Sequence, residues 1–425
     1  MTKAALRTEA AAGLTTFFTM AYIVVVNPSI LAAPGTGMPF SGAMTATVLL
    51  FAALTLLMGL YADLPFAVAP GMGLNAFFAY TVVLGRGVPW QTALGTVFWA
   101  GVLFVAVSVT PLRVRIAEAI PRNLRTASAA GIGIFLAFIG LKNAGMVVAD
   151  PATLVKLGTL DRRALPVFLG VAATVVLMRR KSPIAFLAGI AAATASGWAL
   201  GLVKPPASLV SAPDFSSVFL KLDWRGALAP ALAPTMISIL FTDLFDSIST
   251  FIGVSQAAGL LNERGEPRRL REGLIVDAFA TLLAGVFGTS SGTAYIESAA
   301  GIEMGGRTGM TSVFTALCFL PCFFLAPLAG MVPPFATAPV LVLVGALMFR
   351  SVSALELRKM EDALPAFLTV VLIPLTFSIT QGILWGFVSH AALYALSGRS
   401  KEVSPALWAL AAISAGLLVL EHGAW

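Results

Sequence analysis

The chain has 425 residues, of which 58% are hydrophobic and only 11% charged, with a formal net charge of +7. A soluble domain carries roughly 25% charged residues, so this composition excludes an ordinary soluble protein and predicts a polytopic helical membrane protein. The basic residues lie in short loops between apolar runs. A positive-inside topology therefore explains the net charge better than a nucleic-acid partner, which we do not expect.

The apolar runs predict fourteen membrane segments, at about 14–34, 41–62, 65–85, 89–110, 125–149, 164–179, 182–203, 227–260, 273–289, 291–304, 308–328, 334–350, 364–378 and 380–397. The most basic loops fall on one side of the membrane if the N-terminus is cytoplasmic, as in a bacterial-type inner membrane. A further apolar stretch, about 404–420, predicts an extra hydrophobic helix whose depth in the membrane the sequence leaves open.

Two similar stretches indicate an internal repeat. "ALPVFLGVAATVVL" begins at Ala164 and "ALPAFLTVVLIPL" at Ala363, each as the sixth segment of its half. Because seven is odd, the second copy enters the membrane from the opposite side, which is an inverted repeat typical of secondary transporters. We therefore predict an all-α membrane protein of seven plus seven segments. The repeats cover 1–203 and 227–397, with an outer loop at 204–226 and a C-terminal apolar helix and tail at 398–425.

The third and tenth segments are poor continuous helices. "PFAVAPGMGLNAFFAYTVVLG" and "GTSSGTAYIESAAGIEMGG" are rich in helix-weakening residues near mid-membrane. Irregular backbone at membrane depth is tolerated only where protein or a water-lined cavity satisfies it. Interrupted segments at matching positions of two repeats predict the binding site.

Three acids lie in the apolar segments around this predicted site: Asp243, Asp246 and Glu297. Each opposes membrane insertion by roughly 2.5–3.5 kcal/mol when ionised. Asp243 and Asp246 are three residues apart, so both can face one polar region. A structural alternative is that an acid, above all Asp246, caps an unwound helix end. The functional interpretation is that the acids bind a ligand or exchange a proton, because desolvation favours their neutral form.

Two other side chains suit a nucleobase. Asn75 supplies both a donor and an acceptor, and Tyr295 offers a ring for stacking and a hydroxyl. No phosphate-binding lysine loop, catalytic triad or paired-histidine metal motif accompanies them. We therefore expect neither an enzyme nor an ATP-driven pump, and neither a metal nor a cofactor, with a proton gradient as the driving force.

The chain resembles the nucleobase:cation symporter-2 superfamily, and within it the AzgA-like branch of adenine/guanine/hypoxanthine permeases. The resemblance is carried over about residues 14–350 by "TTFFTMAYIVVVNPSIL", "APGMGLNAFFAYTVV", "LFTDLFDSISTFIGVSQAAGLL", "GTSSGTAYIESAAGIEMGGRTGMTSV" and "PVLVLVGALMF". It implies a core domain (about 14–110 and 227–328) that moves a purine past a gate domain (about 125–203 and 334–397) in an elevator-like alternating-access cycle driven by proton symport. A homodimer is the assembly common in that family.

The resemblance also implies roles for individual residues. Asp243 and Glu297 would bind the base, with Asn75, Gly73 and Tyr295 lining the pocket. Asp246 would couple the proton or shape the site.

Two alternatives remain open at the level of sequence. One is a carrier of the same fold for xanthine, uracil or another small solute. The other is a channel or a non-transporting receptor. Glu297 stands where xanthine and urate carriers typically have glutamine, and the eighth segment lacks the histidine of uracil carriers. Both departures favour hypoxanthine, guanine or adenine, among which the sequence does not choose.

Overall fold

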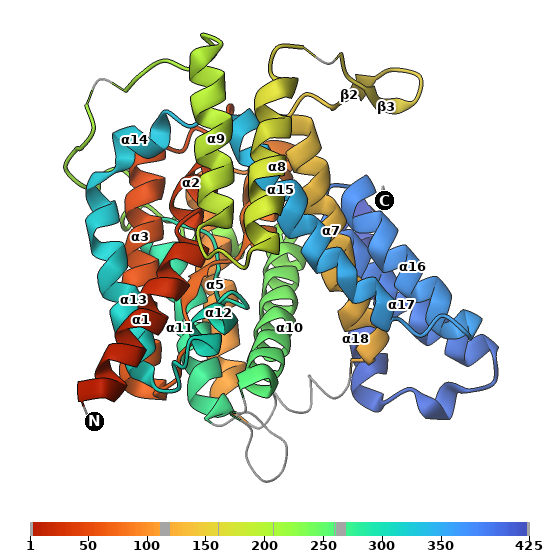
Figure 1. The fold of residues 1–425 in the computed structure, drawn as a ribbon. Helices are drawn as coiled ribbons and strands as arrows, with labels where there is room; N and C mark the ends of the chain where they lie inside the picture. Colours follow the sequence, from red (N-terminus) through yellow and green to blue (C-terminus); the bar gives the residue numbers. More distant parts are fainter. Residues whose placement is uncertain are drawn as a thin grey trace.

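The apolar segments form a bundle of helices that run between two ends of the molecule (Figure 1). The structure is a computed structural model, and it describes residues 3–110, 120–159, 161–206, 208–258, 260 and 269–422. The helices of the first half are α1 (Lys3–Met20), α2 (Ile23–Leu31), α3 (Phe40–Leu57), α4 (Met72–Ala76), α5 (Trp90–Val109), α7 (Arg122–Asn143), α8 (Ala164–Arg179) and α9 (Ala185–Ala199). Those of the second half are α10 (Ala233–Ala258), α11 (Leu270–Phe287), α12 (Ser298–Glu303), α13 (Gly309–Phe319), α14 (Ala326–Gly330), α15 (Pro334–Phe349), α16 (Met360–Leu375), α17 (Ile379–Leu396) and α18 (Pro405–His422).

Each predicted segment contains one or more of these elements, and the plan of two sevens is confirmed. In the described ranges, seven helices are long and apolar enough to cross a membrane, and shorter apolar helices form several of the other segments. The third segment is interrupted: strand β1 (Val68–Pro70) precedes α4, which continues as the π-helix Phe77–Gly85. The tenth is interrupted in the same way, with strand β4 (Gly292–Ala294) before α12.

The helices pack into two groups. The central bundle comprises α1–α5 and α10–α14, held by pairs such as α5 with α11 and α1 with α13. The side bundle comprises α7–α9 and α15–α18, held by pairs such as α7 with α15 and α16 with α17. Each bundle takes elements from both halves of the chain.

The unwound backbone of the two interrupted segments is satisfied inside the central bundle. Strands β1 and β4 pair antiparallel, with Val68 opposite Ala294. The Thr55 hydroxyl accepts from the Val68 N–H at 2.9 Å, and Ser298 Oγ accepts from the Ala67 N–H at 3.0 Å. Backbone at this depth has no water to bond, so strand pairing and hydroxyls replace the missing helical bonds.

The side bundle depends on a close helix crossing. A Cβ placed on Gly345 of α15 would lie 2.4 Å from the carbonyl oxygen of Gly133 on α7, and one on Gly133 would lie 2.6 Å from that of Gly345. Small residues at such crossings let membrane helices pack closely.

We expect Gly345→Leu to separate α7 from α15 and to reduce sharply the yield of folded, monodisperse protein. Overpacking of this kind typically costs about 1–3 kcal/mol, and more where backbone is the obstacle. The measurement is size-exclusion chromatography with thermal unfolding. Gly416→Leu is the matched control, because a Cβ on this α18 glycine meets open space. Equal yields for the two variants would contradict the prediction.

The extra C-terminal stretch is helix α18, which packs along α17 (Figure 1). Leu407, Ala411 and Leu418 are buried on one face, while Trp408 and Ile413 are exposed on another. The helix is 18 residues long, about 27 Å at 1.5 Å per residue, which approaches the thickness of a bilayer core.

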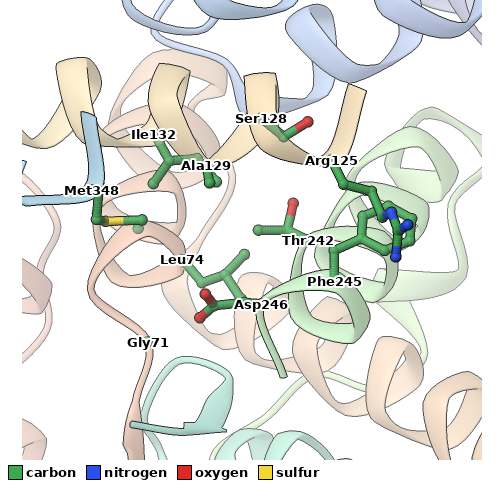
Figure 2. A pocket seen from close by; sticks show the side chains of 11 residues that line it. Gly71, Leu74, Arg125, Ser128, Ala129, Ile132, Thr242, Phe245, Asp246 and Met348 are labelled. Carbon is green, nitrogen blue, oxygen red and sulfur yellow. The ribbon is translucent and has the colours of Figure 1, made fainter. Parts of the chain in front are cut away.

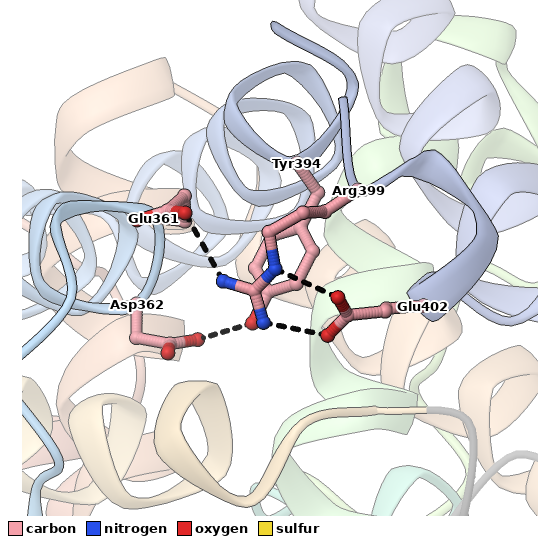
Figure 3. A network of polar contacts seen from close by, with 5 residues as sticks. All are labelled: Glu361, Asp362, Tyr394, Arg399 and Glu402. Carbon is pink, nitrogen blue, oxygen red and sulfur yellow. Dashed lines mark hydrogen bonds and ion pairs between the residues drawn. The ribbon is translucent and has the colours of Figure 1, made fainter. Parts of the chain in front are cut away.

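A polar network fixes the start of α18 (Figure 3). Arg399 donates to Glu361 of α16 at 3.0 Å and to both carboxylate oxygens of Glu402, at 2.7 and 2.6 Å. Nearby, the Tyr394 hydroxyl donates to Asp362 at 2.8 Å. The guanidinium lowers the pKa of Glu402 by hydrogen bonding. These contacts join α16 and α17 to the turn that leads into α18.

One boundary expected from the sequence is wrong. The segment predicted at about 125–149 ends as a helix at Asn143, and the chain then forms a hairpin of β2 (Val147–Asp150) and β3 (Leu154–Leu157). Asp150 accepts from the N–H of Ala152 at 2.9 Å and pairs with Lys156 at 2.8 Å. The bond to Lys156 is the main reason that the pKa of Asp150 falls to about 2. This turn chemistry and ion pair hold apolar residues in a hairpin outside the bundle.

Candidate functional site

A cavity of about 60 Å³ lies between the central and side bundles (Figure 2). One water needs roughly 10–15 Å³ of such volume, so the cavity has room for several waters. The central bundle supplies part of the wall from the third segment and from α10, namely Gly71, Gly73, Leu74, Thr242, Phe245 and Asp246. The side bundle supplies the rest from α7 and α15, namely Arg125, Ser128, Ala129, Ile132 and Met348.

Asp246 is the acid of the cavity wall. Its side chain is solvent-accessible although it stands in the middle of α10, because it opens onto the cavity (Figure 2). Helix α10 runs unbroken from Ala233 to Ala258. The structural alternative that Asp246 caps an unwound helix end is therefore wrong. Its carboxylate is also within electrostatic range of Glu297.

Asp243 lies behind the cavity wall, fully buried. Its Oδ2 accepts from Ser291 Oγ at 2.5 Å and from the hydroxyl of Thr281 on α11. Its Oδ1 has no hydrogen-bond partner among the described residues. The carboxylate thus joins α10 and α11 to the loop that precedes β4.

Asp277 of α11 holds strand β4 in a similar way. Its Oδ1 accepts from the Ala294 N–H at 2.6 Å, and its Oδ2 accepts from the hydroxyl of Ser247. The side chain is fully buried and interacts electrostatically with Asp243. The carboxylate of Asp277 therefore joins α11 to α10 and to β4.

Asn75 and Tyr295 connect the two interrupted segments and do not line the cavity. The Asn75 carbonyl oxygen accepts from the hydroxyl of Ser290, and the Tyr295 hydroxyl donates to the carbonyl of Pro70. Asn75 is fully buried, and Tyr295 is 7% exposed. Both side chains therefore hold the third segment against the tenth.

Glu297 is half-buried at the start of α12. It accepts a hydrogen bond of 3.0 Å from the hydroxyl of Tyr22, at the junction of α1 and α2. Its side chain makes no capping bond to α12. This hydrogen bond thus connects the tenth segment to the first.

Gly73 lines the cavity beside Ile132 of α7. A Cβ there would lie 2.5 Å from Cγ2 of Ile132 on α7, so glycine permits this approach of the two bundles. Of the residues expected from sequence, the cavity brings together Gly73 and Asp246. Asp243, Asn75, Tyr295 and Glu297 form the polar layer around it.

Three polar cavity residues were not expected from the sequence: Thr242, Arg125 and Ser128. Thr242 Oγ1 is buried without a hydrogen-bond partner among the described residues. Arg125 stands at the first position of the segment predicted at about 125–149, and it lies one turn inside α7. The signal was Pro121, which precedes the helix directly and marks a start before Arg125.

Comparisons with known proteins agree with this architecture. A sequence profile described as "Permease family" matches residues 7–384. The chain is 42% identical over 400 residues to adenine permease AdeP of Escherichia coli K12, covering 94% of this chain and 89% of the relative. It is 41% identical over 409 residues to guanine/hypoxanthine permease PbuO of Bacillus subtilis 168, covering 94% of both chains. The transmembrane domain of the cyanobacterial bicarbonate transporter BicA shares the fold, with a TM-score of 0.69 at 16% identity over 91% of this chain and 98% of that one.

Proposed function

The chain belongs to the permease family of nucleobase:cation symporters, and from this membership we propose that it imports purine nucleobases by proton symport. It is a multi-pass membrane transporter and not an enzyme. The relatives named as adenine and guanine/hypoxanthine permeases support hypoxanthine, guanine and adenine as the substrates to test.

The observation that carries the proposal is the open carboxylate of Asp246 in a cavity between two bundles. A carboxylate that opens onto the cavity, and that accepts no hydrogen bond from the described residues, suits the ring N–H groups of a purine. The cavity is flanked by Gly73 of the interrupted third segment, where transporters of this architecture bind their substrates. The cavity is narrow in this structure, so binding a base requires the two bundles to move apart.

The cavity geometry supports a different order for the two acids of α10 from the one expected from sequence. We propose that Asp246 contacts the base, and that Asp243 holds the wall in place through Thr281 and Ser291. Asn75 and Tyr295 set the spacing of the interrupted segments around the bound base. Glu297, within electrostatic range of Asp246, completes the acidic side of the site.

The coupled proton would bind to a cluster of four acids. Asp243, Asp246, Asp277 and Glu297 are linked by electrostatic interactions in a protein interior. Like charges that close in low dielectric disfavour full ionisation. We propose that the cluster takes up a proton together with the base and releases it on the other side.

The two bundles suggest how the cycle runs. The central bundle corresponds to the core domain and the side bundle to the gate domain of an elevator-like, alternating-access carrier. Both interrupted segments and Asp246 are in the central bundle, so the site would move with it. We further propose a bacterial-type inner membrane, a cytoplasmic N-terminus and a homodimer.

The test is uptake into proteoliposomes that contain the purified full-length chain. We expect labelled hypoxanthine, guanine or adenine to accumulate under an inward proton gradient, and a protonophore to reduce accumulation at least about tenfold. Protein-free liposomes are the control. Accumulation that the protonophore leaves unchanged would overturn proton coupling. Absence of uptake and counterflow for all three bases would overturn the purine assignment, and the same panel with xanthine and uracil would identify a related carrier.

A further inference from the structure

Arg125 stands on the side-bundle wall of the cavity, across from the α10 wall that carries Asp246 (Figure 2). Its Nε is buried without a hydrogen-bond partner among the described residues, and none of the ion pairs in the described ranges includes it. A guanidinium is always charged and can only donate hydrogen bonds. The side chain is half-buried, and a charged group with one buried donor left unpaired is costly, so its position indicates an acceptor that joins the site.

The two walls differ in what they offer a ligand. On the central bundle, the Asp246 carboxylate can accept hydrogen bonds, and the hydroxyl of Thr242 has no hydrogen-bond partner among the described residues. On the side bundle, Arg125 can donate, while the Ser128 hydroxyl already donates to the carbonyl of Leu124 at 2.9 Å. A ligand that fits between them presents N–H groups toward one bundle and an acceptor toward the other.

We propose that Arg125 is a specificity-determining residue, which donates to the exocyclic carbonyl oxygen of an oxopurine and so favours hypoxanthine and guanine over adenine. The inference rests on the proposed function. At the 6-position an oxopurine carries an oxygen acceptor, whereas adenine carries an amino donor. Facing Arg125, the amino group leaves the guanidinium unpaired and places two donors together, and such a mismatch discriminates strongly in a buried site.

The second consequence concerns the cycle. Arg125 and Asp246 come from different bundles, so a base held by both bridges the surfaces that slide past each other. The bridge forms only while the site faces the Arg125 end of α7. Arg125 therefore selects the substrate at one stage of the cycle and does not travel with it.

The experiment measures equilibrium binding to the purified full-length chain, by competition of hypoxanthine, guanine and adenine against labelled hypoxanthine. For the wild type we expect adenine to bind at least about tenfold more weakly than hypoxanthine. Arg125→Gln should weaken hypoxanthine by about tenfold and leave adenine within about threefold, so the preference is lost. Arg122→Gln is the matched control, because Arg122 is exposed one turn earlier on α7, and it should keep the wild-type ratio.

The outcomes separate the two proposals. If the wild type binds none of the three bases, the proposed function fails. If it binds them but prefers adenine, or if Arg125→Gln weakens all three by one factor, the role of Arg125 fails and the proposed function stands. Should Arg125→Gln not fold, Arg125→Met keeps an unbranched side chain without any donor, and an unchanged hypoxanthine-to-adenine ratio in that variant overturns the inference.

Discussion

Asp246→Asn should remove proton-driven accumulation of purines while the protein remains folded. The wild-type side chain opens onto the cavity, and no other described residue donates a hydrogen bond to it. Replacing the carboxylate by an isosteric amide therefore leaves no protein donor unpaired. A hydrogen bond to a charged group is worth roughly 1.5–3 kcal/mol. We therefore expect affinity for the base to fall by roughly 10- to 100-fold.

Binding and uptake on matched samples check this prediction. Glu303→Gln removes an exposed acid outside the cavity and should behave as wild type, with an unchanged melting temperature in both variants. Wild-type affinity and accumulation in Asp246→Asn would sink the assignment of this acid. Asp243→Asn tests the order of the two acids: a larger loss of affinity there than in Asp246→Asn would restore the order expected from the sequence.

The main effect of Asp277→Ala should be a loss of fold stability, and not a specific loss of transport. The alanine leaves the buried N–H of Ala294 without its acceptor and removes the carboxylate that accepts from the Ser247 hydroxyl, which still has Thr293 Oγ1 at 3.0 Å. Each unsatisfied buried donor costs roughly 1–3 kcal/mol, and the lost side chain leaves a void. A loss of this size should lower the melting temperature by about 5 °C or more.

The comparison variant is Asp277→Asn, which keeps one acceptor oxygen at the same volume. We expect it to melt between wild type and Asp277→Ala, and to retain measurable base binding. A wild-type melting temperature for Asp277→Ala, measured with purified protein in one detergent, would show that the carboxylate does not hold β4 in place.

The sequence by itself determined the architecture. Apolar runs long enough to cross a bilayer located the segments, because the hydrocarbon core of a membrane excludes polar segments and unpaired backbone. The repeated "ALP" stretches from Ala164 and Ala363 predicted the two sevens, and prolines and glycines located the interrupted third and tenth segments. These signals are local in the chain, so they can be recognised without knowledge of the tertiary structure.

The tertiary structure decided what each polar residue faces. Asp243 and Asp246 lie about 60° apart around α10, close enough for the sequence to place both on one face. Packing against α11 and the loop before β4 buries Asp243, whereas Asp246 stays open to the cavity, and only the folded structure shows this difference. Arg125 needed the fold as well, because its role depends on α7 crossing the other half of the chain. Segment positions follow from hydrophobicity along the chain, whereas the contents of a cavity follow from which surfaces meet, and those surfaces come from residues far apart in sequence.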